Sequence, residues 1–160
     1  KRSAAAHRRP SRARKASPAS PVEQKSAEKQ SYEGGCHCGA LRYSIDAPLA
    51  DVAHCHCTTC RRSTGGIAVT WATVPRGAFR WVRGVPAAYR SSNHAQRFHC
   101  RRCGGQVALW TSRAPLTMDI TVATLDHPEE HPATRHVWTR SRLPWLHLDE
   151  DLPGEEEEAL

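Results

Sequence analysis

The residues with the clearest capacity for chemistry are seven cysteines, three of which lie in the run HCHCTTCRRSTGG at residues 54–66. These three, Cys55, Cys57 and Cys60, are one thiolate too few to close a tetrahedral zinc site, and an odd number of thiols cannot all pair as disulfides. Residues two apart in an extended segment face the same way, so Cys55 and Cys57 should point together, and a turn after them can add Cys60. The spacing therefore predicts a zinc site with three protein ligands and an open position, which is typical of catalytic zinc.

The residues beside these cysteines indicate what such a centre would do. Zinc with three thiolates carries a net negative charge, so it is a weak Lewis acid but a good holder of a further, nucleophilic sulfur, whose pKa would fall from about 8.5. Arg61 and Arg62 follow at once and are expected to offset this charge or to grip carboxylates of a thiol ligand, a solvated basic pair being the alternative. His54 and His56 alternate to the other side of the segment and are not expected as ligands, although a bend would bring His54 round.

The other four cysteines form two clusters far apart in the sequence, Cys36-His37-Cys38 and Cys100-Arg101-Arg102-Cys103. A glycine directly follows the last cysteine of each cluster, and glycine adopts positive φ without penalty, which suits a tight turn that offers two thiolates to one metal. Two such turns facing each other would make a closed four-cysteine zinc site. Disulfide pairing and plain burial of the thiols are the alternatives.

The elements that position these cysteines are expected to be short strands. Several segments from residue 34 onward are rich in β-branched and aromatic residues, some alternate polar with apolar positions, and turn-forming residues separate them. One short helix is expected at residues 58–63, with Thr58 near its N-cap. The predicted fold class is therefore all-β, built from short antiparallel strands. The predicted strands are residues 40–45, 66–74, 78–82, 87–91, 95–100, 105–110 and 118–123.

The sequence after residue 125 has a weaker pattern and is rich in proline and histidine. We expect it to wrap along the domain surface with its aromatic residues, Trp138 and Trp145, pressed inward. Trp145, beside Pro144, is a candidate for lining a cleft. None of the histidines in this region, or elsewhere, is assigned as a general base.

The charge of the chain is concentrated at its start. Nine of the 23 Lys and Arg residues but only two of the 16 acidic residues lie in residues 1–30, so this segment accounts for the whole formal net charge of +7. It has one aliphatic residue larger than alanine, Val22, and no aromatic residue, which predicts a disordered basic tail at residues 1–31. The folded domain is expected at residues 32–153, followed by a solvated acidic tail at residues 154–160. The basic tail could neutralise nucleic-acid phosphates, but a solvated linker, a targeting remnant or upstream sequence that is not natively translated is favoured.

The compartment is expected to be the cytoplasm. No apolar run approaches the roughly 18 residues that span a bilayer, and the start of the chain does not resemble a secretory signal. Seven cysteines without such a signal indicate a reducing compartment, where thiols bind metal or do chemistry more often than they form disulfides. The chain begins without Met, so we expect a trimmed or fragmentary sequence.

These motifs resemble the glutathione-dependent formaldehyde-activating enzyme family. The resemblance extends over nearly all of residues 32–153, and all seven cysteines fall in family positions. It implies a β-tent fold held by a structural zinc, with Cys36, Cys38, Cys100 and Cys103 as the structural ligands and the other three cysteines around a catalytic zinc. The matching stretches are GGCHCGALRY (34–43), HCHCTTCRRSTGG (54–66), RFHCRRCGGQV (97–107), ITVATLD (120–126) and HVWTRSRLPWLHLDEDLP (136–153).

The resemblance also implies a reaction. The founding activity of the family is the condensation of formaldehyde with glutathione to S-(hydroxymethyl)glutathione, which is classed as carbon–sulfur lyase chemistry and serves formaldehyde detoxification. This implies a bacterial enzyme in which the sulfur of glutathione occupies the open zinc position and adds to the aldehyde carbon. The resemblance also bears on a second hypothesis, because a relative in the family, centromere protein V, joins an arginine-rich disordered region to this kind of domain. The second hypothesis is therefore a non-catalytic zinc scaffold or binding module whose basic tail contacts nucleic acid or another acidic partner. A third, a purely structural zinc protein, requires the central site to be closed.

Overall fold

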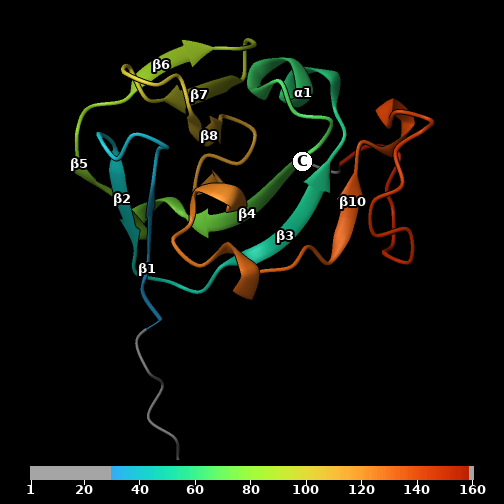
Figure 1. The fold of residues 1–160 in the computed structure, drawn as a ribbon, viewed down its shortest axis with the longest axis horizontal. Helices are drawn as coiled ribbons and strands as arrows, with labels where there is room; N and C mark the ends of the chain where they lie inside the picture. Colours follow the sequence, from blue (N-terminus) through green and yellow to red (C-terminus); the bar gives the residue numbers. More distant parts are fainter. Residues whose placement is uncertain (1–29, 159–160) are drawn as a thin grey trace, which may run out of the picture.

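The computed structural model describes residues 30–158, so the predictions made for residues 1–29 lie outside the described residues. The described chain is mostly β, as predicted, and forms two sheets (Figure 1). The strands are β1 (Tyr32–Gly35), β2 (Arg42–Ile45), β3 (Ala50–Cys55), β4 (Val69–Pro75), β5 (Phe79–Arg83), β6 (Ala87–Arg90), β7 (Ala95–His99), β8 (Gln106–Thr111), β9 (Thr117–Thr121) and β10 (Arg135–Val137). The small sheet has the order β1-β2-β5 and the large sheet the order β10-β3-β4-β9-β8-β7-β6. Neighbouring strands are antiparallel, except that β10 runs parallel to β3.

One α-helix, α1 (Thr58–Thr64), interrupts the strands between β3 and β4. Cys57 is its N-cap residue, and the helix ends at Gly65, whose φ of 76° suits a residue without a Cβ. The predicted helix is confirmed, with its cap one residue earlier than expected. Short 3₁₀ turns also occur, at η1 (Arg76–Ala78), η2 (Val122–Thr124), η3 (Pro128–Glu130) and η4 (Thr139–Ser141). Between residues 30 and 158, every helix is too short to cross a bilayer.

The two faces of the large sheet pack against different buried clusters, as the residues of β4 show. Ala72 and Val74 are fully buried in a core that they share with Ile45 of the small sheet. Trp71 belongs instead to a second buried cluster that contains Cys60. Because successive side chains of a strand point to opposite faces, one face of β4 packs the main core and the other faces the three-cysteine region.

All seven predicted strands are present, although the one expected at residues 66–74 begins only at Val69, because the chain first turns at Gly65. Three further strands, β1, β3 and β10, were not predicted. β1 contains two glycines and β10 has only three residues, so neither carries a local strand pattern. Pairing with β2 and with β3 fixes them as strands.

The C-terminal segment lies along β10 at the edge of the large sheet (Figure 1). The expectation of inward-facing aromatic residues holds for Trp138, which packs against the cluster around Cys60, but it is wrong for Trp145, whose exposed fraction is 62%. Residues 154–157 are exposed. They are nevertheless attached to β10, because the backbone N–H of Glu155 donates to the carbonyl of His136 at 2.9 Å.

Candidate metal centres and an adjoining cavity

Four cysteines converge from two turns that belong to different sheets. Cys36 and Cys38 lie in the turn between β1 and β2, and Cys100 and Cys103 in the turn between β7 and β8. The sulfur atoms all lie within 4.8 Å of one another, with 3.7 Å between Cys36 and Cys38 and 3.8 Å between Cys38 and Cys100. Zn–S bonds of about 2.3 Å in a tetrahedron place sulfurs about 3.8 Å apart, so the four thiols fit one zinc ion.

The two turns have the glycine conformations that the sequence predicts. Gly39 has a φ of 70° and Gly104 a φ of 75°, both in the left-handed region. Each turn also directs a backbone N–H at sulfur, from Leu41 to Cys36 and from Arg102 to Cys100, both at 3.3 Å. Such donors stabilise a thiolate over a thiol. One ion here would join the small sheet to the far end of the large one.

The second cluster is built where β3 runs into α1. Cys55 is the last residue of β3, Cys57 caps the helix and Cys60 lies in its first turn. The three sulfur atoms lie within 4.8 Å of one another, with 3.6 Å between Cys55 and Cys60, and the Cys60 N–H donates to the Cys57 sulfur at 3.1 Å. Within residues 30–158 no histidine or carboxylate joins this group, so it offers three ligands.

Charge repulsion makes a cation necessary if all three of these thiols are to ionise. Hydrogen bonds with Cys55 and Cys60 hold the pKa of the Cys57 thiol far below its ordinary value. The same kind of contact, with Cys57 and Cys60, raises the pKa of the Cys55 thiol, and burial adds to the rise. Thiolates this close repel one another in a buried site, and a thiolate-binding cation such as Zn²⁺ removes that penalty.

The histidines of the motif are engaged on the other side of β3. The His54 ring bonds to Thr70 Oγ1 at 2.8 Å and to Asp149 Oδ2 at 2.9 Å. His56 Nε2 lies 2.9 Å from Nδ1 of His136. Both rings of the HCHC run therefore hold β3 to β10 and to the C-terminal segment.

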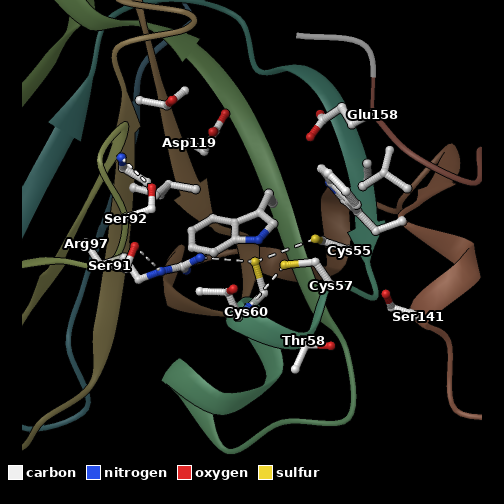
Figure 2. Close-up of a pocket in the computed structure, with 18 of the residues that line it drawn as sticks. Cys55, Cys57, Thr58, Cys60, Ser91, Ser92, Arg97, Asp119, Ser141 and Glu158 are labelled. Atoms are coloured by element: carbon white, nitrogen blue, oxygen red, sulfur yellow. Dashed lines mark hydrogen bonds between the residues drawn. The ribbon is translucent and has the colours of Figure 1, made fainter.

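A cavity of about 360 Å³ opens beside the three cysteines. Its apolar wall includes Trp71, Leu109 and Trp138, and several hydroxyl groups line the rest. Figure 2 shows the three sulfur atoms that line this cavity near the centre of the view, with Arg97 on one side and Glu158 on the other. The size is at the lower end of the range for small-molecule sites, about 300 Å³ upward. The arrangement suits a small thiol ligand with its sulfur at the cysteines.

Arg97 is one of the cavity residues that the sequence analysis did not identify. It lies on β7 with only 4% of its surface exposed, and its Nη2 donates to the Cys60 sulfur at 3.4 Å. Its Nε donates to Ser91 Oγ at 3.1 Å, which fixes the guanidinium in place. One signal was present in the sequence: Arg97 stands next to the apolar Phe98 in the predicted strand at residues 95–100, so the two side chains should face opposite sides of the sheet. In the structure Phe98 packs against the main core.

Arg61 and Arg62, which the sequence favoured as contacts for a thiol ligand, lie outside the cavity. Arg61 is half-buried on α1 and its Nη2 lies 3.5 Å from Thr58 Oγ1, whereas Arg62 is exposed. Neither lines the cavity, and Trp145 does not line it either. A role for Arg61 and Arg62 toward a thiol ligand stays a prediction. Arg97 is the guanidinium that contacts a cysteine of the central cluster.

Three carboxyl groups line the cavity, and one of them, Asp51, is paired with Arg135. Asp119 of β9 accepts a hydrogen bond from Thr73 Oγ1 at 2.8 Å, and burial raises the pKa of its carboxyl to about 6. Glu158 enters from the C-terminal segment, and burial followed by the charge of Asp119 raises its pKa as well. Of the two guanidinium groups in the lining, Arg97 lies beside the cysteines and Arg140 pairs with Glu157.

Comparison with known proteins gives a consistent result. Residues 31–141 match the family model described as glutathione-dependent formaldehyde-activating enzyme. A Halomonas elongata protein that is provisionally named as such an enzyme is 23% identical over an alignment of 126 residues, and the match covers 73% of this chain and 80% of that protein. An uncharacterized lyase of Schizosaccharomyces pombe is 30% identical over 80 residues, 46% of this chain and 53% of that one. The crystal structure of a Rhodobacter sphaeroides protein superposes with a TM-score of 0.51 at 25% identity, covering 77% of this chain and 99% of that one.

Proposed function

The chain belongs to the glutathione-dependent formaldehyde-activating enzyme family, and from this premise we propose that it joins a thiol, with glutathione the leading candidate, to formaldehyde or another small aldehyde. The product would be an S-hydroxymethyl adduct, which makes the reaction that of a carbon–sulfur lyase. The observation that carries the proposal is the three-cysteine cluster on the wall of a cavity, with no fourth ligand within the described residues. A cluster of this kind leaves a coordination position for a ligand sulfur.

Two zinc ions fit the cysteines of the chain. Cys36, Cys38, Cys100 and Cys103 would hold a structural ion, and Cys55, Cys57 and Cys60 a second one. When bound at the three-cysteine cluster, zinc supplies a positive charge that lowers the pKa of an incoming thiol and keeps it ionised at neutral pH.

The chain's own residues would prepare the ligand for addition. Arg97 donates to the Cys60 sulfur and so draws negative charge away from the cluster. Trp71 and Trp138 form apolar walls that exclude water from the ligand sulfur. In the addition the sulfur forms a bond to the aldehyde carbon, the carbonyl π bond breaks, and its oxygen takes up a proton equivalent to the one the thiol released.

The direct test compares adduct formation with its spontaneous rate. We expect the zinc-loaded protein to exceed the uncatalysed rate with glutathione and formaldehyde, and Cys60→Ser to abolish the excess. Ser112→Ala, on the exposed turn after β8, is the matched control and should retain full activity. Zinc content should be two per chain in the wild type and one in Cys60→Ser.

The same experiment addresses the non-catalytic scaffold. If no thiol gives an excess rate and zinc stays at one per chain in both proteins, the central cysteines do not form an open site and the lyase proposal is wrong. Two zinc ions without any excess rate would favour a carrier of thiol adducts over an enzyme.

A further inference from the structure

One transverse row of residues runs along the cavity side of the large sheet. The register pairs Thr73 of β4 with Asp119 of β9, Asp119 with Leu109 of β8, and Leu109 with Arg97 of β7. All four line the cavity. Because neighbouring strands lie about 4.8 Å apart, the Cα atoms of Arg97 and Asp119 are separated by roughly 10 Å along this row. The row therefore has a basic end and an acidic end.

The basic end is committed to the cysteines. Arg97 donates through Nη2 to Cys60 and through Nε to Ser91. Its remaining nitrogen, Nη1, has no hydrogen-bond partner within the described residues, although the side chain is almost completely buried. A buried donor without a partner calls for an acceptor on a ligand or on water. Arg97 makes no hydrogen bond or ion pair with the carboxyl of Asp119, two strands away, within the described residues.

The acidic end has no cation of its own to spare. Arg140 also lines the cavity, but it pairs with Glu157. Only the Thr73 hydroxyl bonds to the Asp119 carboxyl, and Asp119 takes part in no ion pair within residues 30–158. Glu158 lines the same cavity, and its nearest cation, Arg135 at 3.7 Å, is shared with Asp51 and Glu155. A carboxylate withdrawn from water without a cation is costly, so a cationic group brought by a ligand would be stabilised there.

We propose that Asp119, assisted by Glu158, binds the ammonium group of the thiol ligand. This inference rests on the proposed function, because the ligand sulfur is taken to lie at the three cysteines. A γ-glutamyl thiol has groups for both ends of the row: its sulfur and its α-ammonium are separated by about the length of an extended dipeptide, roughly 7 Å, with one amide carbonyl between them. That carbonyl is a suitable acceptor for Arg97 Nη1. In cysteine or cysteamine the two groups lie too close together to serve both ends.

The test varies the ammonium and its partner together. We would measure binding of glutathione and of its glutaryl analogue, which lacks only the amine, to the zinc-loaded full chain by calorimetry. The wild type should bind glutathione at least about tenfold more tightly, as expected for a desolvated charge pair. In Asp119→Asn this ratio should fall to about threefold or less, and in Glu158→Gln it should fall by a smaller factor. Glu129→Gln, at an exposed carboxylate outside the cavity, is the matched control and should keep the wild-type ratio.

The outcomes separate this inference from the proposed function. Equal affinity of the wild type for both thiols overturns the ammonium site and leaves the thiol-binding proposal standing. A parallel loss of both affinities in Asp119→Asn, at an unchanged ratio, also overturns it, because a merely structural role would weaken both ligands alike. If the wild type binds neither thiol, the proposed function itself is wrong.

Discussion

The two cysteine clusters of this protein both consist of cysteine sulfur atoms, but they differ in the number of sulfurs and in the residues around them. The four-cysteine cluster is closed, lies between two glycine turns and joins the two sheets, with Cys38 and Cys103 exposed. The three-cysteine cluster sits at the start of α1 on the wall of a cavity, with a buried guanidinium against one sulfur. In the function proposed above, ligand number and immediate surroundings, more than ligand type, would separate a site that holds the fold from one that holds a ligand.

The largest expected effect separates the clusters by stability. We expect Cys100→Ser to lower the free energy of unfolding by at least about 3 kcal/mol, because losing a structural metal removes binding energy that belongs to folding. Cys60→Ser should cost much less, since the large sheet and the main core do not depend on the central cluster. Thermal unfolding of both variants, with zinc content measured on the same samples, checks this. Similar losses in both variants would mean that the three-cysteine cluster is structural too.

The next effect concerns the charge beside each cluster. We expect Arg97→Gln to reduce zinc affinity at the central cluster, or adduct formation there, by about 10- to 100-fold, the usual consequence of removing a partner of a metal ligand. Arg97→Lys should recover only part of the loss, because a lysine keeps the charge but not the forked geometry that reaches Cys60 and Ser91 together. Arg102→Gln is the matched control at the other cluster, since its contact to sulfur runs through the backbone N–H.

Retention of both metals and full adduct formation in Arg97→Gln would contradict this role. Competition with a chromophoric chelator, which resolves the two zinc ions by affinity, gives the readout. Because Arg97 is buried, the unfolding midpoint of each variant should be measured first, so that loss of fold is not mistaken for loss of metal.

A smaller effect concerns the acidic end of the cavity and has a defined pH dependence. The pKa of Asp119 is raised to about 6 by burial and by the charges of Asp51 and Cys60, with Thr73 opposing and Glu158 facing the same cavity. The folded state therefore holds this proton more tightly than the unfolded state, and the wild type loses stability as pH rises from about 4 to 6.

Asp119→Asn should be more stable than the wild type by about 2 to 3 kcal/mol at pH 7, with the difference vanishing below about pH 4. Urea unfolding of both proteins at a series of pH values measures it, and a pH-independent difference would show that Asp119 does not titrate in this way.

The sequence was informative wherever the pattern is local. The cysteine spacing, the glycine after each structural pair and the strand patterns are properties of short segments, so seven strands, α1 and both clusters could be anticipated. Arg97, Asp119 and Glu158 could not, because they meet at one cavity only through the register of β7, β8 and β9 and the return of the C-terminal segment. Arg61 and Arg62 were favoured because they are near the cysteines in sequence. The turn of α1 carries them away from the cavity that those cysteines line.

The smallest effect compares one glycine at each cluster. Gly104 and Gly65 have φ values of 75° and 76°, and a Cβ at either position would meet no atom within 4 Å. Alanine at either position should therefore lower the free energy of unfolding by about 1 kcal/mol, from the left-handed backbone alone. Gly77→Ala is the control and should cost less, because φ there is not positive and the space is also open.

The metal sites of the two variants should respond differently. Gly104 shapes the turn that presents Cys100 and Cys103, so its alanine variant should lose structural zinc to a chelator faster, whereas Gly65 lies beyond the end of α1 and should leave the central zinc unchanged. Equal zinc release from the two variants would mean that the closed cluster is set by the sheets around it, and not by its glycine turns.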